Sequence, residues 1–480
     1  MKLLLKDHDW TLAYKIESNF RSIISEQESY GWKIDTDLLD KLLIDLHYQR
    51  DQILDEAYAL VPLNVINQGE IVPFKKDGKP TVNLTKWYNS LPIRLFPMSA
   101  VAGPFTKVNF EQINLESAKQ RIEVLETFGW KPTEYNYKTD KNKRPILGED
   151  GKKIILSPKL TDDSVINCDI KRAKTLGLLL LDYVQVSHRY KLLKGLQDLI
   201  EDDGAIHSGG LTVGANTGRM MHRGIVNIPS VGSFYGKECR SIFSSREGYC
   251  LIGADLKSLE NRLIAHYTFP YDKGEYALRL EEEDSHEATV NLFATIGINI
   301  DRSTAKTCNY ALGFGAQVKK VSEILGVGMP LASKAYHLWW SDKQSMKNLK
   351  EAIERGLKSR GQYDGKALGN EAWIKGLDGR KIFVRSPHSL INCLIQNAGA
   401  VVCKFITCAI DKEIKARGLD AHFVIVYHDE VDIEVKRNDL TIESVSAIIR
   451  NAVIKCNEYF KFNIPMEMDI KVGASWYEVH

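Results

Sequence analysis

The stretch Arg302-Ser-Thr-Ala-Lys306-Thr-Cys-Asn-Tyr310-Ala-Leu-Gly-Phe314-Gly315 places two cations ahead of two aromatic residues and a glycine. These positions recur every four residues, so on a helix of about 3.6 residues per turn they form one slowly drifting stripe. By spacing alone Tyr310 and Phe314 would be core residues, but their place after the cations favours stacking on a base and contact with its sugar. The stretch therefore predicts a helix that binds a nucleoside triphosphate.

Two acidic segments flank this stretch in the chain. Asp255 follows the apolar run 249–254, and Asp429 lies in a tight turn between two apolar strands. A single aspartate at a strand end is usually a turn former. Two of them beside a cationic helix can share two Mg²⁺ ions, for which Mn²⁺ can substitute, and so promote an in-line phosphoryl displacement. Glu430 is either a third ligand or a supporting carboxylate, and we favour the supporting role.

Three basic residues are candidates for holding the phosphates. Lys306 can bind phosphate or donate a proton to the leaving pyrophosphate, and such a general acid contributes about 10²–10⁴-fold. Arg302 offers a bidentate fork, and His286 lies on a helix that starts near Asp284 and can reach the same phosphates. Taken singly, the ordinary explanations are an exposed lysine, a surface salt bridge and a partly buried histidine.

Composition bounds the class of protein. The 480 residues, 44% of them hydrophobic, can form two or three subdomains with their own cores. A net charge of +2 neither demands nor excludes nucleic acid. No apolar run approaches about 18 residues and the first residues do not form a signal peptide, so we expect no membrane association. The eight cysteines lack a C-x-x-C pair or a zinc pattern, which predicts reduced, mostly buried thiols in a cytoplasmic protein.

Hydrophobic periodicity and turn residues predict a mixture of helices and strands. Residues 61–107 contain several prolines and lysines, which predicts an inserted loop-rich element. Residues 135–158 predict an exposed hairpin or loop, and Asn114 is a candidate helix cap. Helices are predicted over residues 10–60, 114–128, 164–201, 258–267, 284–326, 331–358 and 440–458, and strands over 249–255, 423–427, 431–435 and 466–472.

Several segments, taken together, match the motifs of a known family. Leu-Ile-Gly-Ala-Asp-Leu-Lys-Ser-Leu-Glu-Asn-Arg at 251–262, the opening stretch at 302–315 and Tyr-His-Asp-Glu-Val at 427–431 resemble, in that order, motifs A, B and C of family A (Pol I-type) DNA polymerases. Thr-Gly-Arg at 217–219, followed by Asn-Ile-Pro at 227–229, resembles the stretch that holds the primer–template. Residues 379–388, with Asn392 and Gln396, resemble the segment that tracks the template and the minor groove.

The resemblance implies an α+β right-hand polymerase, with a thumb, a palm that contains an antiparallel sheet, and helical fingers. Residues 373–381 and 476–480 are similar to the replicative polymerases of short-tailed phages that use thioredoxin. The implied divisions are an N-terminal segment and helical thumb over 1–204 with the loop-rich insertion at 61–107, a palm over 205–280 and 388–480, and fingers over 281–387.

The resemblance also implies roles at the nucleotide. Asp255 and Asp429 would bind the two metal ions, and Lys306 would be the catalytic acid. Glu260 would lie near Tyr310 and block a ribose 2′-hydroxyl, and a tyrosine rather than a phenylalanine at 310 implies tolerance of dideoxynucleotides. The residues implied to hold the dNTP are Arg302, Lys306, His286, Tyr310, Glu260 and Phe314.

Further residues are implied to contact DNA. Arg219 and Gln396 would contact minor-groove acceptors, which all correct base pairs share, so that shape is checked without reading sequence. His428 would lie near the primer terminus, and His388 and Asn392 belong to the segment that tracks the template.

Some positions depart from the family pattern. The family usually has glycine at the position of Ala311 and tyrosine at the position of Phe314, and its serine-glutamine step in motif A is Lys257-Ser258 here. It usually carries a 3′–5′ exonuclease domain before the thumb, whereas the early acids Asp7 and Asp9 sit in no predicted buried strand. We therefore expect no proofreading in this polypeptide, and a separate exonuclease is a candidate partner.

The leading hypothesis is a DNA-templated DNA polymerase of a phage replisome, working in the host cytoplasm with primer–template DNA, dNTPs and a helicase-primase. The insertion at 61–107 would bind a processivity factor such as thioredoxin, or grip duplex DNA as a basic flap. A repair or translesion role stays open. Glu260 and Glu430 argue against a single-subunit RNA polymerase, and the intact carboxylates and phosphate stripe argue against a non-catalytic replisome scaffold.

Overall fold

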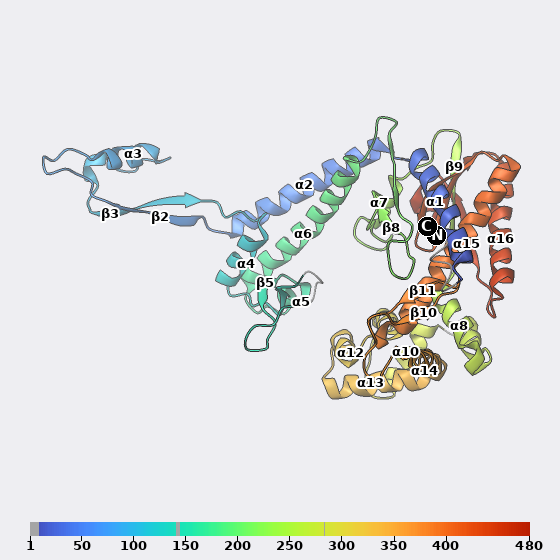
Figure 1. Ribbon diagram of the computed structural model, residues 1–480. Coiled ribbons are helices and arrows are strands. Elements are labelled where there is room, and N and C mark those ends of the chain that lie inside the picture. Colours follow the sequence, from blue (N-terminus) through green and yellow to red (C-terminus); the bar gives the residue numbers. More distant parts are fainter. Residues whose placement is uncertain (1–8, 141–144, 283) are drawn as a thin grey trace. The chain divides into compact units, whose positions relative to one another are not determined.

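The computed structural model describes residues 9–140, 145–282 and 284–480 (Figure 1). The chain forms two compact units: the first contains the residues up to Leu39 together with Gly195–His480, and the second is Asp40–Lys194. The second unit is therefore an insertion in the sequence of the first. The expected divisions into thumb, palm and fingers stay predictions, and Asp7 lies outside the described residues.

A four-stranded antiparallel sheet forms the base of the first unit. Its strands are β9 (Tyr249–Leu256), β12 (Ala421–Tyr427), β13 (Glu430–Lys436) and β14 (Met468–Gly473), in the order β12-β13-β9-β14. All the apolar runs predicted as strands therefore pair in one sheet, and the α+β fold class is confirmed. The two central strands, β9 and β13, are buried along most of their length, and each has a strand neighbour on both sides.

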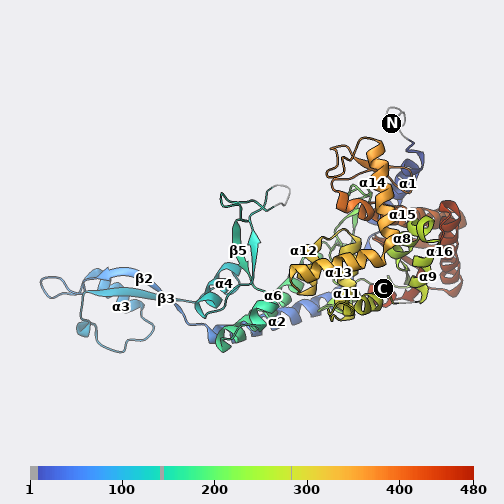
Figure 2. The same ribbon diagram turned by 90° about the horizontal axis from the view of Figure 1, so that it is seen from below.

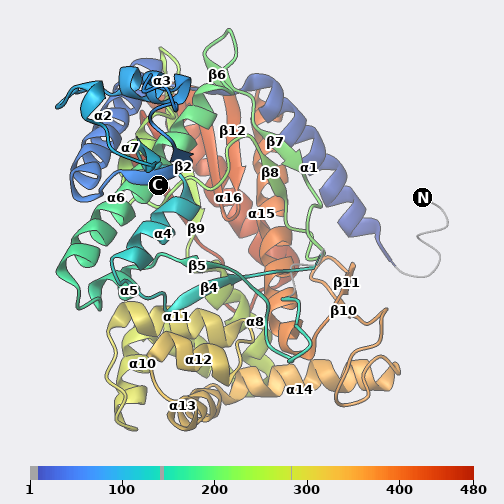
Figure 3. The ribbon, with the colours of Figure 1, turned by 90° about the vertical axis from the view of Figure 1, so that its left-hand side faces the viewer.

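Helices from both ends of the chain pack on this sheet (Figure 3). The helix α15 (Leu390–Arg417) contacts both α1 (Thr11–Tyr30) and α16 (Asp439–Phe460). In addition, α1 contacts β12, and α16 contacts β9, β13 and β14. The apolar faces of these elements therefore share one hydrophobic core with the sheet.

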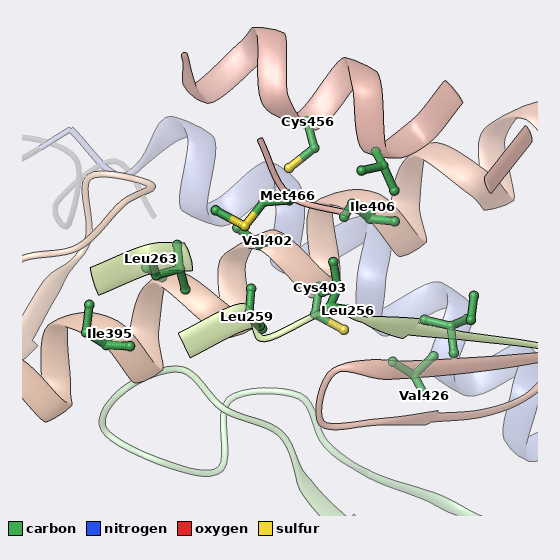
Figure 4. Packing of buried hydrophobic residues seen from close by; sticks show 14 of the residues in the cluster. Leu256, Leu259, Leu263, Ile395, Val402, Cys403, Ile406, Val426, Cys456 and Met466 are labelled. Carbon is green, nitrogen blue, oxygen red and sulfur yellow. The ribbon is translucent and has the colours of Figure 1, made fainter. Parts of the chain in front are cut away.

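Side chains from the sheet and from α15 interdigitate in that core. Figure 4 shows Leu256 and Val426 of the strands beside Val402, Cys403 and Ile406 of α15. Over the described residues, one helical stretch, Pro387–Arg417, is apolar and long enough to cross a membrane, but 78% of its apolar window is buried inside the protein. Such burial is typical of a core helix. The eight cysteines are free, and six of them are buried.

The segment predicted as one helix over 284–326 is instead three helices, α10 (Ser285–Ala294), α11 (Arg302–Gly313) and α12 (Val318–Leu325). The chain breaks after α10 because Gly297 takes up a left-handed conformation with φ 80°. The side chain of Asp301 then caps α11 by accepting a bond from the backbone N–H of Thr304.

Four more helices surround these three. The predicted helix 331–358 is two helices, α13 (Met329–Asp342) and α14 (Gln344–Ser359), separated at Lys343. The other two are α8 (Leu259–Asp272), which follows β9, and α9 (Glu275–Glu282). The pairs α10–α11, α11–α12, α12–α13 and α8–α14 are in contact, so this helical layer is continuous with the end of the sheet.

Short elements complete the first unit. Three two-stranded antiparallel pairs are β1 (Trp32–Lys33) with β6 (Ala205–Ile206), β7 (Gly209–Leu211) with β8 (Met221–Arg223), and β10 (Trp373–Lys375) with β11 (Lys381–Phe383). The short helices are α7 (Gly236–Ser241) and α17 (Trp476–Val479). Both are positioned by contact with one another, and α17 also contacts β9 and β14.

The second unit has its own core, which joins α2 (Thr36–Leu60), α4 (Ala118–Thr127) and α6 (Lys171–Gln197). The long helix predicted over 164–201 begins only at Lys171, after the short α5 (Asp162–Ile166). The predicted cap Asn114 is wrong: Ser117 caps α4 by accepting from the N–H of Gln120, and Asn114 accepts from Glu116 in the turn before it.

The insertion at 61–107 is more ordered than its prolines predict. It contains β2 (Asn64–Ile71) and α3 (Val82–Ser90), and β2 pairs with β3 (Phe105–Glu111) in an antiparallel hairpin (Figure 2). The expected loop-rich element is therefore a hairpin whose connection carries a helix. The expected hairpin at 135–158 is present as β4 (Glu134–Tyr137) paired with β5 (Ile155–Lys159).

Candidate active site

Two aspartates meet at one edge of the four-stranded sheet. Asp255 is the penultimate residue of β9, and Asp429 lies in the turn between β12 and β13. The backbone N–H of Leu256 donates to the carbonyl of Asp429 at 3.1 Å, and Glu430 pairs with Asp255 in the β13–β9 register. His428 takes a left-handed backbone conformation with φ 60°, which completes the tight turn. The two aspartates are therefore fixed by rigid strands.

The electrostatics of this pair favour cation binding. Burial, followed by the charges of Asp429 and Glu430, raises the pKa of Asp255 to about 6. The pKa of Asp429 is also raised, mainly by burial. A cation between them would relieve this repulsion. Among the described residues, no group of three or more His, Cys, Asp or Glu side chains is placed to hold a metal ion. A pair of carboxylates fits Mg²⁺, which commonly completes its shell with water and substrate phosphates.

Glu430 has its carboxylate engaged by protein groups. It is buried, and its Oε1 accepts a hydrogen bond from the indole Nε1 of Trp476 at 2.9 Å. Its Oε2 lies 2.9 Å from Nδ1 of His480. Because both oxygens already have partners, the arrangement favours the supporting role over that of a direct metal ligand.

The stripe on α11 lies on an exposed face. The helix buries Ala305, Cys308 and Leu312 on its other side. Lys306 is exposed, and the ring of Tyr310 lies 6.0 Å from that of Phe314 between centroids. The predicted helix is thus amphipathic, with Lys306 and the two rings on the face opposite its buried side.

Arg302 and His286 flank the start of that face. The Nε atom of Arg302 pairs with Asp284 at 2.5 Å, and both side chains are largely exposed. His286 lies 6.1 Å from Tyr310 between ring centroids. Burial, with the charges of Arg302 and Lys306, lowers the pKa of His286 although Asp284 opposes the shift. The imidazole is therefore mostly neutral near pH 7.

Asn309, which the sequence pattern did not single out, connects the helices around this face. Its Oδ1 accepts hydrogen bonds from Thr289 at 2.9 Å and from the indole of Trp339 at 2.7 Å. Its Nδ2 donates to the carbonyl of Ser285 at 3.0 Å and lies 3.2 Å from Nδ1 of His286. Because an indole can only donate, the orientation of the amide is fixed, and His286 is left with its proton on Nε2.

Glu260 and Tyr310 line one pocket. Glu260 lies at the start of α8, and the pocket also contains His286 and Phe314. The charge of Glu260 helps to raise the pKa of Tyr310, an effect that follows burial in size and reports their proximity. The guanidinium of Arg219 approaches Glu260 at 3.4 Å. The structure thus brings the expected sugar-gate pair into one cavity.

The predicted DNA contacts lie at three places in the structure. Arg219, His428 and Asp429 line a common small cavity beside the carboxylate pair. His388 lies apart from them, with Nδ1 3.1 Å from the side-chain amide of Gln317. Asn392 and Gln396 lie in the first two turns of α15, and the Oδ1 of Asn392 is buried without a hydrogen-bond partner. That unsatisfied oxygen is able to accept a bond from a ligand or water.

His222 is a second residue that the sequence pattern did not reveal. Its ring lies 4.7 Å from that of Tyr427 and 5.4 Å from that of His428 between centroids. Burial, with the neighbouring His428, lowers its pKa to about 4, so it is neutral near pH 7. The aromatic cluster therefore supports the turn that carries Asp429 without adding charge to it.

Nucleic-acid polymerases are the class in which paired aspartates at a sheet edge meet a cationic and aromatic helix of this kind, and comparison with known proteins narrows the class. Residues 99–478 match the model of DNA polymerase family A. The chain belongs to that family and is a DNA-directed DNA polymerase.

Curated relatives include phage and bacterial enzymes. The chain is 26% identical to the DNA-directed DNA polymerases of Enterobacteria phage T3 and Escherichia phage T7, over 98% of this chain and 70% of each relative. It is 25% identical to DNA polymerase I of Streptococcus pneumoniae over 62% of this chain and 34% of that protein. These matches confirm the resemblance inferred from the motifs.

A solved structure supports the fold. The polymerase domain of Pol1 from M. smegmatis, determined in complex with a DNA primer-template and dNTP, superimposes with a TM-score of 0.67 at 18% identity. The superposition covers 96% of this chain and 70% of that one. The similarity establishes the right-hand α+β architecture independently of the motifs.

Proposed function

We propose that this polymerase adds dNTPs to a primer 3′-hydroxyl by nucleotidyl transfer, with two Mg²⁺ or Mn²⁺ ions held between Asp255 and Asp429. The observation that carries the proposal is the meeting of these two carboxylates, each with a raised pKa, at the end of rigid strands. When bound, the ions would activate the primer hydroxyl and stabilise charge at the transferred phosphate. Glu430 would act as a supporting carboxylate that helps to fix the geometry of the site.

The cationic end of α11 would hold the triphosphate. Arg302 would exchange its exposed partner Asp284 for phosphate oxygens. This exchange costs little free energy, because exposed ion pairs contribute little to stability. His286 would donate its Nε2 proton to a phosphate oxygen, since Asn309 occupies its Nδ1. Lys306 would place its ammonium at the leaving pyrophosphate and donate a proton there.

The aromatic end of α11 would select the sugar and base. Tyr310 and Phe314 would stack on the incoming nucleotide. Glu260 would exclude a 2′-hydroxyl, because it lines the same pocket as the two rings. Movement of α11 over a matched pair would be the induced-fit step.

The primer–template would lie along the residues that the sequence predicts as DNA contacts. Arg219 and Gln396 would donate to minor-groove acceptors, and His428 would lie at the primer end. His388 and Asn392 would contact the template. The bound primer-template and dNTP of the M. smegmatis structure support this arrangement by analogy.

The biological role that we propose is phage genome replication, and the two phage relatives support it. A repair or translesion role is the alternative. We also propose that this polypeptide does not excise mismatched ends. Of the early acids, Asp9 accepts a bond from the N–H of Thr11 at the start of α1. A separate exonuclease and a helicase-primase would then be partners.

The insertion at 61–107 is the proposed site of a processivity factor. It exposes large apolar side chains, among them Val72, Ile93, Leu95 and Phe96. Such exposure is typical of a surface that binds a protein partner. Because Lys75, Lys76 and Lys79 of the same insertion are exposed as well, a basic flap on duplex DNA is the alternative.

Primer extension by the Asp429→Asn variant tests the proposal. The substitution keeps shape and removes one metal-binding charge, so we expect the rate to fall by about 10³-fold or more. Asp439→Asn, at the start of α16, is a matched control in the same fold and should retain full activity. Substantial extension by Asp429→Asn in Mg²⁺ or Mn²⁺ would contradict the metal assignment, and shortening of a mismatched primer by the parent protein would contradict the absence of proofreading.

A further inference from the structure

A buried ion network lies directly behind the turn that presents Arg219. The ammonium of Lys404, on α15, is 4% exposed and contacts both carboxylate oxygens of Glu17 on α1, at 2.7 and 2.8 Å. The same ammonium donates to the backbone carbonyls of Thr212 and Gly218, each at 2.7 Å. One side chain of α15 thus contacts two points of a loop and a helix near the start of the chain.

Other members of the network fix the same turn. Asn397 lies seven residues before Lys404, two turns away on the same face of α15, and donates to the carbonyl of Thr217 at 2.9 Å. Arg380 pairs with Glu17 at 2.6 Å and with the buried Asp378 at 2.7 Å. The charges of the two cations and the two carboxylates therefore balance within the network.

The turn has little freedom to move away. Gly218 has φ 81°, and a Cβ added there would lie 2.3 Å from Nη1 of Arg380, so only glycine allows this approach. The N–H groups of Gly214 and Ala215 both donate to the carbonyl of Arg219, at 3.0 and 3.1 Å. Arg219 is therefore held from its own backbone as well as from the residues before it.

We infer that Lys404, together with Glu17, is a positioning residue for Arg219 in checking the primer terminus. Lys404 lines the same cavity as Arg219, His428 and Asp429, so the network reaches the active site itself. Buried charge pairs usually contribute little to the free energy of folding, because the cost of desolvation offsets their attraction. Their use here is to set the place of a backbone turn. The inference rests on the minor-groove role proposed for Arg219.

A double-mutant cycle tests the inference. The readout is the ratio of single-nucleotide extension rates from a matched and a mismatched primer end, with thermal unfolding measured alongside. Lys404→Met keeps the length of the side chain and removes its donors, and we expect the ratio to fall about 10-fold. Lys404→Arg should restore part of it. In an Arg219→Ala background Lys404→Met should change the ratio less than about twofold, because the two residues act as one unit.

A matched control is available on the same helix. Lys415 also pairs α15 with α1, through Glu26 at 2.8 Å, but it is 50% exposed and does not touch the turn. Lys415→Met should leave the ratio unchanged. If Lys404→Met fails to fold, Glu17→Gln replaces it, since it keeps a hydrogen-bonding oxygen for Lys404 and should lower the ratio in the same direction.

The outcomes separate the inference from the function on which it rests. If Arg219→Ala lowers the ratio and Lys404→Met only lowers the melting temperature, the inference is overturned while the role of Arg219 stands. If the two effects multiply, Lys404 acts independently of Arg219 and the inference is also overturned. If Arg219→Ala leaves the ratio unchanged, the proposed role of Arg219 is wrong and the inference falls with it.

Discussion

Replacing Asp255 by asparagine is expected to stabilise the metal-free protein and to abolish primer extension. Burial and the charges of Asp429 and Glu430 raise the pKa of this carboxyl from 3.8 to about 6. A tenfold change in proton affinity is about 1.4 kcal/mol, so the full difference is about 3 kcal/mol of folding free energy. The side chain is partly exposed to water, which reduces the expected gain for Asp255→Asn to about 1–2 kcal/mol.

The sign of the effect follows from proton binding. Between pH 3.8 and about 6 the folded chain binds more protons at Asp255 than the unfolded chain. The stability of the parent, relative to the variant, therefore falls as pH rises through this window. The two proteins should be equally stable below about pH 3, the gap should reach about half its final size near pH 5, and it should be constant above about pH 7.

Urea unfolding in EDTA, followed by tryptophan fluorescence at several pH values, measures this gap. Asp469→Asn is a matched control, because Asp469 faces Asp255 on β14 but is exposed and paired with Lys257 at 2.9 Å, so its effect should stay within about 0.5 kcal/mol. Added Mg²⁺ should stabilise the parent more than Asp255→Asn. A variant less stable than the parent at pH 8 in EDTA, or a gap that does not depend on pH, would refute the reasoning.

Two further predictions concern α11, the helix proposed to hold the nucleotide. Asp284→Asn keeps a capping side chain for α10 but removes the charge that holds Arg302, so the KM for dNTPs should fall about two- to fivefold at unchanged kcat. Steady-state kinetics measure this, and a raised KM would show that Asp284 helps rather than competes. Tyr310→Phe removes the hydroxyl of a residue that lines the pocket proposed for the sugar, and it should reduce use of dideoxynucleotides, relative to dNTPs, by about 10-fold or more. A chain-termination assay with mixed nucleotides checks it, and an unchanged ratio would contradict the implied tolerance.

The sheet and the carboxylate pair were predictable because their signals are local. An apolar run that ends in aspartate, as at 249–255, carries both its strand character and its charge in a few neighbouring residues. The helical stripe at 302–315 is local in the same way. The predicted strands therefore pair as one sheet, and the two aspartates meet at its edge.

Residues whose partners are distant in sequence could not be predicted. Asn309 looks like an ordinary polar residue until Trp339 and Thr289 are brought against it by folding. Lys404 meets Glu17 across 387 residues, so no window of sequence contains both. The loop-rich element predicted at 61–107 is a hairpin for another reason. Prolines are excluded from helix interiors, but they are compatible with the ends of a hairpin and with its connection.

The position of α1 has a consequence for the order of folding during synthesis. This helix packs on β12 and α15, which follow it in the chain by nearly the whole length of the protein. At about 5–20 residues per second, a ribosome needs roughly 20–80 s to make the intervening chain. The unit Asp40–Lys194, with a core of its own, can fold within that interval. The apolar face of α1 must wait for its partners, which makes this helix a natural site for chaperone capture on the nascent polymerase.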